Sequence, residues 1–304
     1  MPKEPELTLQ QYRMRPANLV RRGQRLAVTL FNQEASDLDL TRPQFEAMIA
    51  ISHFPGLDQI TLARALGIDR STMTLVLDGL MDRTLLHRTV HPQDRRRRVL
   101  DLTALGLRAL EAARLRARLA QDRLMSPFSK GERVEFVDAM SRVVLGARSS
   151  APPLELPTGI PAAQSAEFAG LMGRPAFLLR RCAQIGFAFF GEATQGLDLT
   201  PIQYGVMFLL KVLPTDEATA ARLLAVERST IDRLLQRLKA RGYVERVDDD
   251  SRAPLHLSAQ GEALFYKVRD MAIEADRLMF GPLSAVERER LVNMLDKLLV
   301  AQGA

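Results

Sequence analysis

The chain has 304 residues, 47% of them hydrophobic and 26% charged, a balance that excludes a disordered or fibrous protein and indicates a globular one. This length favours two domains over a single core. The charge is uneven, because residues 1–152 hold 24 Lys and Arg against 17 Asp and Glu, whereas residues 153–304 hold 18 against 19. A basic surplus in one half suggests a polyanion as its partner.

The sequence has no segment suited to a membrane. No apolar run approaches the roughly 20 residues of a membrane-spanning helix, and the start, MPKEPELTLQQ, lacks the apolar core of a secretion signal. The single cysteine, Cys182, excludes an intramolecular disulfide. We therefore expect a cytoplasmic protein.

The sequence contains an internal repeat. RPANLVRRGQRLAVTLFNQEA from Arg15 returns as RPAFLLRRCAQIGFAFFGEA from Arg174, and LTRPQF returns as LTPIQY, both at an offset of 159 residues. RSTMTLVLDGL returns as RSTIDRLLQRL at an offset of 158, and LTALG returns as LSAQG at 155. The offset changes only between blocks, where loops absorb insertions. The chain therefore contains two copies of one domain.

Each copy opens with an apolar-periodic segment, at residues 16–36 and 175–195, that begins with a proline at the favoured first helical position. A second helix follows the dipeptide LT and ends near HFPG in one copy and KVLP in the other. Next come a short helix, TLARALG or TAARLLA, a tight turn, and a helix headed by Asp69 or Glu227. This order predicts a helix-turn-helix.

The last helix of each helix-turn-helix has an apolar stripe at i, i+3, i+4 and i+7, which we expect to pack inward. The stripe residues are Met73, Val76, Leu77 and Leu80 in the first copy and Ile231, Leu234, Leu235 and Leu238 in the second. The opposite face carries arginines and short hydroxyl side chains, which near a helix N-terminus can reach phosphates and base edges.

A two-stranded hairpin follows in each copy. LLHRTV and RRVLDLT bracket the turn HPQD, and YVERV and PLHLS bracket DDDSR. The first hairpin contains four consecutive arginines, Arg95 to Arg98. Such a run is often only solvated surface, but beside a helix-turn-helix we expect it to meet the minor groove and flanking phosphates. Strand alternation should direct some of the four away from DNA.

Helices flank each helix-turn-helix. Thr103 and Ser258 are expected N-caps of helices that run to about residues 125 and 280, and a capping box opens a last helix at Ser129 or Ser284. The fold class is therefore mainly α with small β-wings, in two winged helix-turn-helix domains. We place these domains at residues 1–148 and 169–304, joined by a Pro-rich linker at 149–168.

Four pieces of the sequence resemble the MarR family of bacterial transcription regulators. They are the paired arginines of the first helix, LTRPQF, LARALGIDRSTMTLVLDGL, and HPQDRRRRVLDLTALG. The resemblance implies dimerisation through the first and last helices, two recognition helices in successive major grooves, and in many members release of DNA by a small molecule, often an aromatic acid. Two copies in one chain would then form an intramolecular pseudo-dimer, and we expect a monomeric chain rather than a dimer of fused chains.

The two copies differ at positions that bear on DNA contact. Thr84 stands where the second copy has Gly242, and Leu75 stands where it has Arg233. The second hairpin is shorter and acidic, with Arg252 at its tip. Three acids there should be repelled by phosphate.

These patterns define the candidate contacts of the chain. We expect DNA contacts from the exposed helix faces and the wings, namely Arg70, Ser71, Thr72, Thr74, Arg95, Arg96, Arg97, Arg98, Arg228, Ser229, Thr230, Arg233 and Arg252. The first-helix arginines have two interpretations: salt bridges across the pseudo-dimer, or anchors for an anionic effector. They are Arg21, Arg22, Arg180 and Arg181.

Other chemistry is not favoured. Cys182 on the first helix of the second copy is either an oxidation sensor or, as is more common, a buried inert thiol. The histidines His53, His87, His91 and His256 are accompanied by no cysteine cluster, so we expect no metal. Phosphate-cradling loops and nucleophile elbows are absent from the sequence, and we expect neither catalysis nor a cofactor.

The main functional hypothesis is a transcription regulator that binds double-stranded DNA sequence-specifically. We expect a repressor that is relieved by a small anionic or aromatic acid effector and that acts on a pseudo-palindromic operator with unequal half-sites. The alternative is a winged-helix scaffold in which the first domain binds DNA and the acidic second domain binds a protein. The charge difference between the halves motivates the alternative.

Overall fold

The computed structural model describes residues 7–54, 56–91, 94–155, 170, 173–248 and 253–303, with residues 91 and 94–97 described by their backbone alone. In the first copy the elements are α1 (Leu9–Arg13), α2 (Pro16–Glu34), α3 (Arg42–His53), α4 (Gln59–Leu66), α5 (Arg70–Asp82), β1 (Leu86–His91), β2 (Asp94–Leu102), α6 (Ala104–Leu124) and α7 (Lys130–Gly146). In the second copy they are α9 (Pro175–Ala193), α10 (Pro201–Val212), α11 (Glu217–Leu224), α12 (Arg228–Ala240), β3 (Val244–Arg246), β4 (Leu255–Leu257), α13 (Ala259–Met279) and α14 (Ala285–Ala301).

Polar caps define where the helices begin. Thr103 and Ser258 accept hydrogen bonds from the backbone N–H groups three residues later, at 2.9 and 3.0 Å, and start α6 and α13 as expected. The expected capping boxes at Ser129 and Ser284 are also formed. At the head of α5 Asp69 caps the helix, whereas Glu227 makes no capping bond at the head of α12. The order of elements in each copy, with a hairpin after α5 and after α12, confirms the mainly α fold with two winged helix-turn-helix units.

The two wings differ in length. β1 pairs antiparallel with β2 from Leu86↔Leu102 onward, with an irregularity between Val90 and His91. β3 and β4 pair over only three residues each, from Val244↔Leu257. Both hairpins are joined by an isolated bridge to the loop before the helix-turn-helix, at Leu57↔Leu100 and at Thr215↔Leu255. Each wing is therefore attached to the helix-turn-helix unit that carries the recognition helix.

The helical flanks of the two copies interlock. α2 packs against α9, α7 of the first copy packs against α9, and α14 of the second copy packs against α2. At the crossing of α2 and α9, a Cβ added to Gly23 would lie 3.0 Å from Leu179 Cδ2, so the missing side chain permits the close approach. One buried cluster runs through this crossing into the first winged lobe. The chain is an intramolecular pseudo-dimer.

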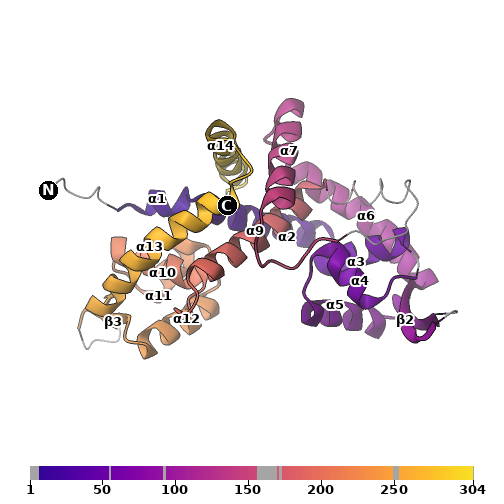
Figure 1. Cartoon of the computed structure of the whole chain (residues 1–304), viewed down its shortest axis with the longest axis horizontal. Helices are drawn as coiled ribbons and strands as arrows, with labels where there is room; N and C mark the ends of the chain where they lie inside the picture. The colour runs from indigo at the N-terminus through magenta and orange to yellow at the C-terminus, as the bar shows by residue number, and fades with distance from the viewer. Residues whose placement is uncertain are drawn as a thin grey trace.

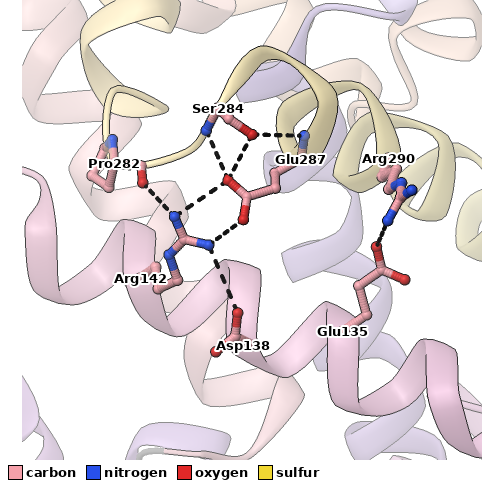
Figure 2. A network of polar contacts seen from close by, with 7 residues as sticks. All are labelled: Glu135, Asp138, Arg142, Pro282, Ser284, Glu287 and Arg290. Atoms are coloured by element: carbon pink, nitrogen blue, oxygen red, sulfur yellow. Dashed lines mark hydrogen bonds and ion pairs between the residues drawn. The ribbon is translucent and has the colours of Figure 1, made fainter.

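Ion pairs join α7 to α14, and Figure 2 shows the pair between Arg142 and Glu287. Arg142 binds the carboxylate of Glu287, and Lys297 Nζ lies 2.6 Å from Glu132 Oε1. These two pairs correspond to each other at the 155-residue offset of the copies. An isologous dimer has this property, in which each contact occurs twice.

The two helix-turn-helix units lie at opposite ends of the molecule (Figure 1). In that view α5 and α12 both lie at the lower edge, and the wings lie at the two outer ends. The predicted inward stripes are buried in both helices, except that Leu234 is only partly buried. The outward faces of α5 and α12 are therefore available on one side of the molecule.

A short helix, α1, was not among the sequence predictions. It carries Tyr12 into the core of the second copy, where the ring lies 5.3 Å from that of Phe208 and 6.4 Å from that of Tyr204. The first copy thus contributes a segment to the second lobe. Residues 156–169, which include most of the predicted linker, lie outside the described residues, so the division at 148 and 169 stays a prediction.

Candidate nucleic-acid interface and ligand pocket

The N-terminus of α5 is organised by Asp69. Its carboxylate accepts hydrogen bonds from the hydroxyls of Ser71 (2.5 Å) and Thr72 (2.6 Å) and from the backbone N–H of Thr72 (2.9 Å). These bonds, that of Ser71 first, lower the pKa of Asp69 to about 2. Ser71 and Thr72 are exposed, and because they donate to Asp69 they offer acceptor lone pairs to a partner.

The next turn of α5 presents one apolar side chain outward. Thr74 Oγ1 donates to the carbonyl of Arg70 at 2.9 Å and accepts from Gln59 Nε2 at 2.7 Å, so its hydroxyl is already engaged. Leu75 beside it is 74% exposed. A large apolar side chain this exposed on a helix face is a candidate contact for a thymine methyl group.

A basic hollow lies between α4, α5 and the first wing. Three arginines from three elements, Arg70, Arg88 and Arg98, line a depression of about 370 Å³. Arg88 Nη2 donates to the Gln59 side chain at 2.9 Å and lies 3.9 Å from Asp78. Arg98, at the base of β2, is exposed. Guanidinium groups converging beside a helix N-terminus suit a phosphate.

The equivalent place in the second copy is neutralised. Glu217 stands where the first copy has Gln59, and its Oε1 lies 2.7 Å from Arg246 Nη2 and 3.6 Å from Lys239 Nζ. Arg246 also donates to the carbonyl of Ala253 at 2.6 Å. Arg246, which corresponds to Arg88 of the first wing, is therefore paired with an internal carboxylate.

The head of α12 keeps cationic surface despite this. Arg228 and Arg233 are exposed. Arg228 lies 4.0 Å from Asp232, and Arg233 donates weakly to the Ser229 carbonyl (3.4 Å) and to the Thr230 hydroxyl (3.5 Å). The predicted contacts on α12 thus share one exposed face.

Part of the predicted wing surface is outside the described residues. This holds for Arg252 and for the side chains of Arg95, Arg96 and Arg97. Their contacts with DNA remain predictions.

A pocket of about 450 Å³ lies between the first helices of both copies and the second winged lobe. One wall is apolar and aromatic, with Phe187, Phe190 and Tyr204. Burial raises the pKa of Tyr204 to about 12, so its phenol stays protonated at neutral pH. The pocket size lies within the range of small-molecule sites.

Arginines also line this pocket. Arg15 is ion-paired with Asp276 at 3.0 Å and lies over the Tyr204 ring at 5.1 Å. Arg21 donates to Asn18 Oδ1 at 2.9 Å, and no ion pair joins it to a carboxylate in the described part of the chain. A pocket lined by both aromatic rings and arginines suits a planar anion.

The four first-helix arginines have separate roles. Arg21 lines the pocket, whereas Arg180 Nη2 lies 3.0 Å from Glu46 Oε2 of the first copy, as the salt-bridge interpretation expected. Arg181 is 3% exposed and donates to the carbonyls of Gly67 and Pro152, both at 2.9 Å. Arg22 lies near Asp296 and is half-buried. Of the four, the structure brings Arg21 and Arg180 to the pocket.

Cys182 is fully buried, and its thiol lies 3.7 Å from the carbonyl of Met140. Burial raises its pKa, which disfavours the reactive thiolate and supports the inert interpretation over the oxidation sensor. Among the described residues no cluster of His, Cys, Asp or Glu is placed to hold a metal ion. None of the described helices is long and apolar enough to cross a membrane.

Several residues of these sites were missed from the sequence. Gln59 and Arg88 complete the basic hollow, and Tyr12, Arg15 and Asp276 line the pocket. Aligning the two copies would have singled out the hollow, since Gln59 pairs with Glu217 there. The pocket residues come from segments distant in sequence, and no local pattern links them.

Two segments of the chain match family models. Residues 40–97 and residues 197–253 each match a model described as the MarR family.

Proteins similar to this chain are transcription regulators. The chain is 34% identical over 127 residues to a putative transcriptional regulatory protein for the hcr operon of Thauera aromatica, covering 41% of this chain and 75% of that protein. It is 28% identical over 127 residues to the transcriptional repressor NicR of Pseudomonas putida, covering 42% and 80%. A solved structure of the PcaV regulator from Streptomyces coelicolor with its natural ligand is 33% identical over 47% of this chain and 99% of that one, with a TM-score of 0.43.

Proposed function

The chain belongs to the MarR family of transcriptional regulators, and we propose that it is a repressor that binds an operator through α5, α12 and both wings. The basic hollow of Arg70, Arg88 and Arg98 carries this proposal. It lies against the N-terminus of a helix whose outward face is exposed, which is where phosphate contacts position a recognition helix. The repressor role is also the role that NicR's name gives to that relative.

A single chain supplies both recognition helices. In a two-fold dimer of this kind the half-sites lie about 10 bp apart, one turn of DNA. The first copy has three arginines in its hollow, whereas Glu217 neutralises the equivalent cation of the second. The half-site beneath the first copy therefore binds more strongly.

A small anionic aromatic effector controls this binding. The pocket supports it through an aromatic wall, four arginines and a single described carboxylate, that of Asp276, which Arg15 already pairs. The pocket also touches both first helices and α10, so a bound molecule contacts the dimer-like core and the second winged lobe at once. A ligand with different affinity for two lobe positions shifts their populations.

A hydroxyl-radical footprint on the operator tests this proposal. The expected pattern is two protected half-sites about 10 bp apart, unequal in strength, and weaker protection when an aromatic acid is added. Protection of one half-site per chain would contradict it. That result would favour the scaffold in which the second copy, with its neutralised wing, binds a protein instead.

A further inference from the structure

The ligand pocket has a counterpart in the other half of the molecule. The counterpart is lined by Phe45, Arg174 and Gln121, which occupy the places of Tyr204, Arg15 and Asp276 in the pocket of the second lobe. Duplication would produce two equal cavities. Instead the second-lobe pocket measures about 450 Å³ and the first-lobe counterpart about 20 Å³.

Two substitutions between the copies place charged side chains in the small cavity. Glu46 in α3 stands at the position of Gly205 in α10, and Arg42 stands at the position of Pro201. At Gly205 the space that a side chain would take is already occupied, since an added Cβ would lie 2.1 Å from the Tyr12 hydroxyl. The first lobe therefore fills its cavity with a carboxylate and a guanidinium, whereas the second places Tyr12 beside Gly205 and keeps a pocket of about 450 Å³.

Glu46 is held as a bound carboxylate would be. Its side chain is 1% exposed, Oε1 accepts a hydrogen bond from Arg42 Nε at 3.1 Å, and Oε2 forms an ion pair with Arg180 Nη2 at 3.0 Å without a hydrogen bond. A charge this deeply buried persists only with such partners. Arg180 is the counterpart of Arg21, whose side-chain partners in the described part of the open pocket are Asn18 and Tyr12, both uncharged.

The closed side also ties its helix-turn-helix to the core. Arg180 Nη2 donates to the carbonyl of Leu66 at 2.9 Å, and Arg181 Nη1 donates to that of Gly67 at 2.9 Å. Both carbonyls lie at the end of α4, in the turn before α5. On the open side the equivalent turn is held by Arg25, which donates to the carbonyl of Ala225.

We propose that Glu46 is an internal ligand that closes the first-lobe pocket, so that the chain takes one effector, an aromatic carboxylate, in the second-lobe pocket alone. This inference rests on the proposed effector control and adds the number of effector molecules that one chain binds. The turn before α5 is held by Arg180 and Arg181 without effector, and the effector contacts only the lobe that carries α12. Arg21 is the anchor for the ligand carboxylate, as Arg180 is for Glu46.

Calorimetric titration of the full chain with benzoate, with neutral benzamide as a control, tests the closure. Wild type is expected to bind one benzoate per chain, and Glu46→Ala is expected to bind two, because it empties the first-lobe cavity and frees Arg180. Glu46→Gln keeps the volume and should stay at one. Glu46→Gly, which copies the residue of α10, serves as a second opening variant, and thermal melting verifies that each variant is folded.

The outcomes separate closure from effector control. Two sites in wild type, or no added site in either folded opening variant, would overturn the inference. A wild type that binds no benzoate while Glu46→Ala binds one would contradict an aromatic carboxylate as the ligand of the second-lobe pocket but uphold the closure. Combining Glu46→Ala with Arg21→Gln should return the count to one, and an unchanged count of two would show that Arg21 is no anchor.

Discussion

Leu75 and Arg233 occupy the same place on the two recognition helices and differ in chemistry. Leu75 is 74% exposed, and Arg233 is exposed with only weak intrahelical bonds. An apolar side chain in the major groove selects the thymine methyl group, whereas arginine selects guanine O6 and N7. The two half-sites of the operator should therefore differ in base as well as in strength.

Leu75→Arg tests this difference. The variant should shift the preferred base at one position of the stronger half-site from thymine to guanine, with a discrimination of about 1–3 kcal/mol. Selection of binding sequences from a random duplex library measures it, and Arg233→Leu is the matched change in the other copy. Identical preferences in wild type and both variants would exclude these residues from base contact.

The basic hollow makes a second residue-scale prediction. Replacing Arg88 and Arg98 by alanine should weaken binding to all sequences and reduce the salt slope of log K by about 1 for each phosphate that the variant no longer binds. Arg246→Ala is the matched control, because Glu217 already pairs that cation. Titration with operator DNA at salt concentrations from about 50 to about 200 mM measures the effect. If Arg246→Ala changed the salt slope as much as the variant of Arg88 and Arg98 does, that result would contradict the neutralisation of Arg246 by Glu217.

Some of these residues could be found from sequence and others could not. The arginines of α5 and β2 could be identified by their charge and position. The correspondence of Glu46 to Gly205 is readable from the aligned copies. The contact of Glu46 with Arg180 is not, because it joins helices 134 residues apart in the chain and depends on how the copies dock.

At the scale of the element, the end of each recognition helix requires a left-handed residue. Gly242 has φ +72° in the second copy, but in the first copy Thr84 has φ +54°. A β-branched side chain in this region is strained, by on the order of 1–3 kcal/mol. The backbone carbonyl of Thr84 still accepts a bond from Thr103 Oγ1 at 2.7 Å, which holds the strained turn in place.

Thr84→Gly should therefore stabilise the first winged lobe. The strain it removes exceeds the entropy that glycine loses on folding, and we expect a gain of about 1 kcal/mol in the free energy of unfolding. Urea unfolding followed by circular dichroism measures it. The reciprocal Gly242→Thr should destabilise, and a destabilising Thr84→Gly would mean that the turn is not strained.

Helix boundaries were predictable because caps are local. Thr103 and Ser258 lie one residue before their helices, as expected from their side-chain chemistry. The short helix α1 was missed although Thr8 and Gln11 form a capping box. Five residues are too few for helical periodicity, and α1 is stabilised by packing Tyr12 into the other copy, which the sequence does not reveal.

For the whole molecule, the pairs across α7 and α14 join the copies (Figure 2). On the pseudo-axis Glu135 faces Arg290 at 3.4 Å, and these two positions correspond at the 155-residue offset. Identical residues would face each other there in a homodimer. Because the fused copies could diverge, the axis now carries opposite charges, which favours pairing of unlike copies within one chain.

Because these ion pairs join the two copies, we expect the folded chain to lose stability at acid pH. Lys297 lowers the pKa of Glu132 to about 2, and Arg142 lowers that of Glu287 to about 2, both from an ordinary value of 4.5. A depressed carboxyl pKa stabilises the fold above its unfolded value, so this contribution is lost as pH falls from about 5 to about 2. The melting temperature should fall over that range at low salt. The double variant Glu132→Gln and Glu287→Gln should fall less, and an equal fall would show that the pairs contribute nothing measurable.

Covalent fusion turns dimer formation into an intramolecular step, with an effective concentration of roughly millimolar for a linker of suitable reach. The protein should therefore bind DNA as one chain at any dilution. The most direct test is the mass of the complex with a duplex carrying both half-sites. One chain of 33.9 kDa per duplex is expected, whereas two chains per duplex would contradict the intramolecular pseudo-dimer as the DNA-binding unit.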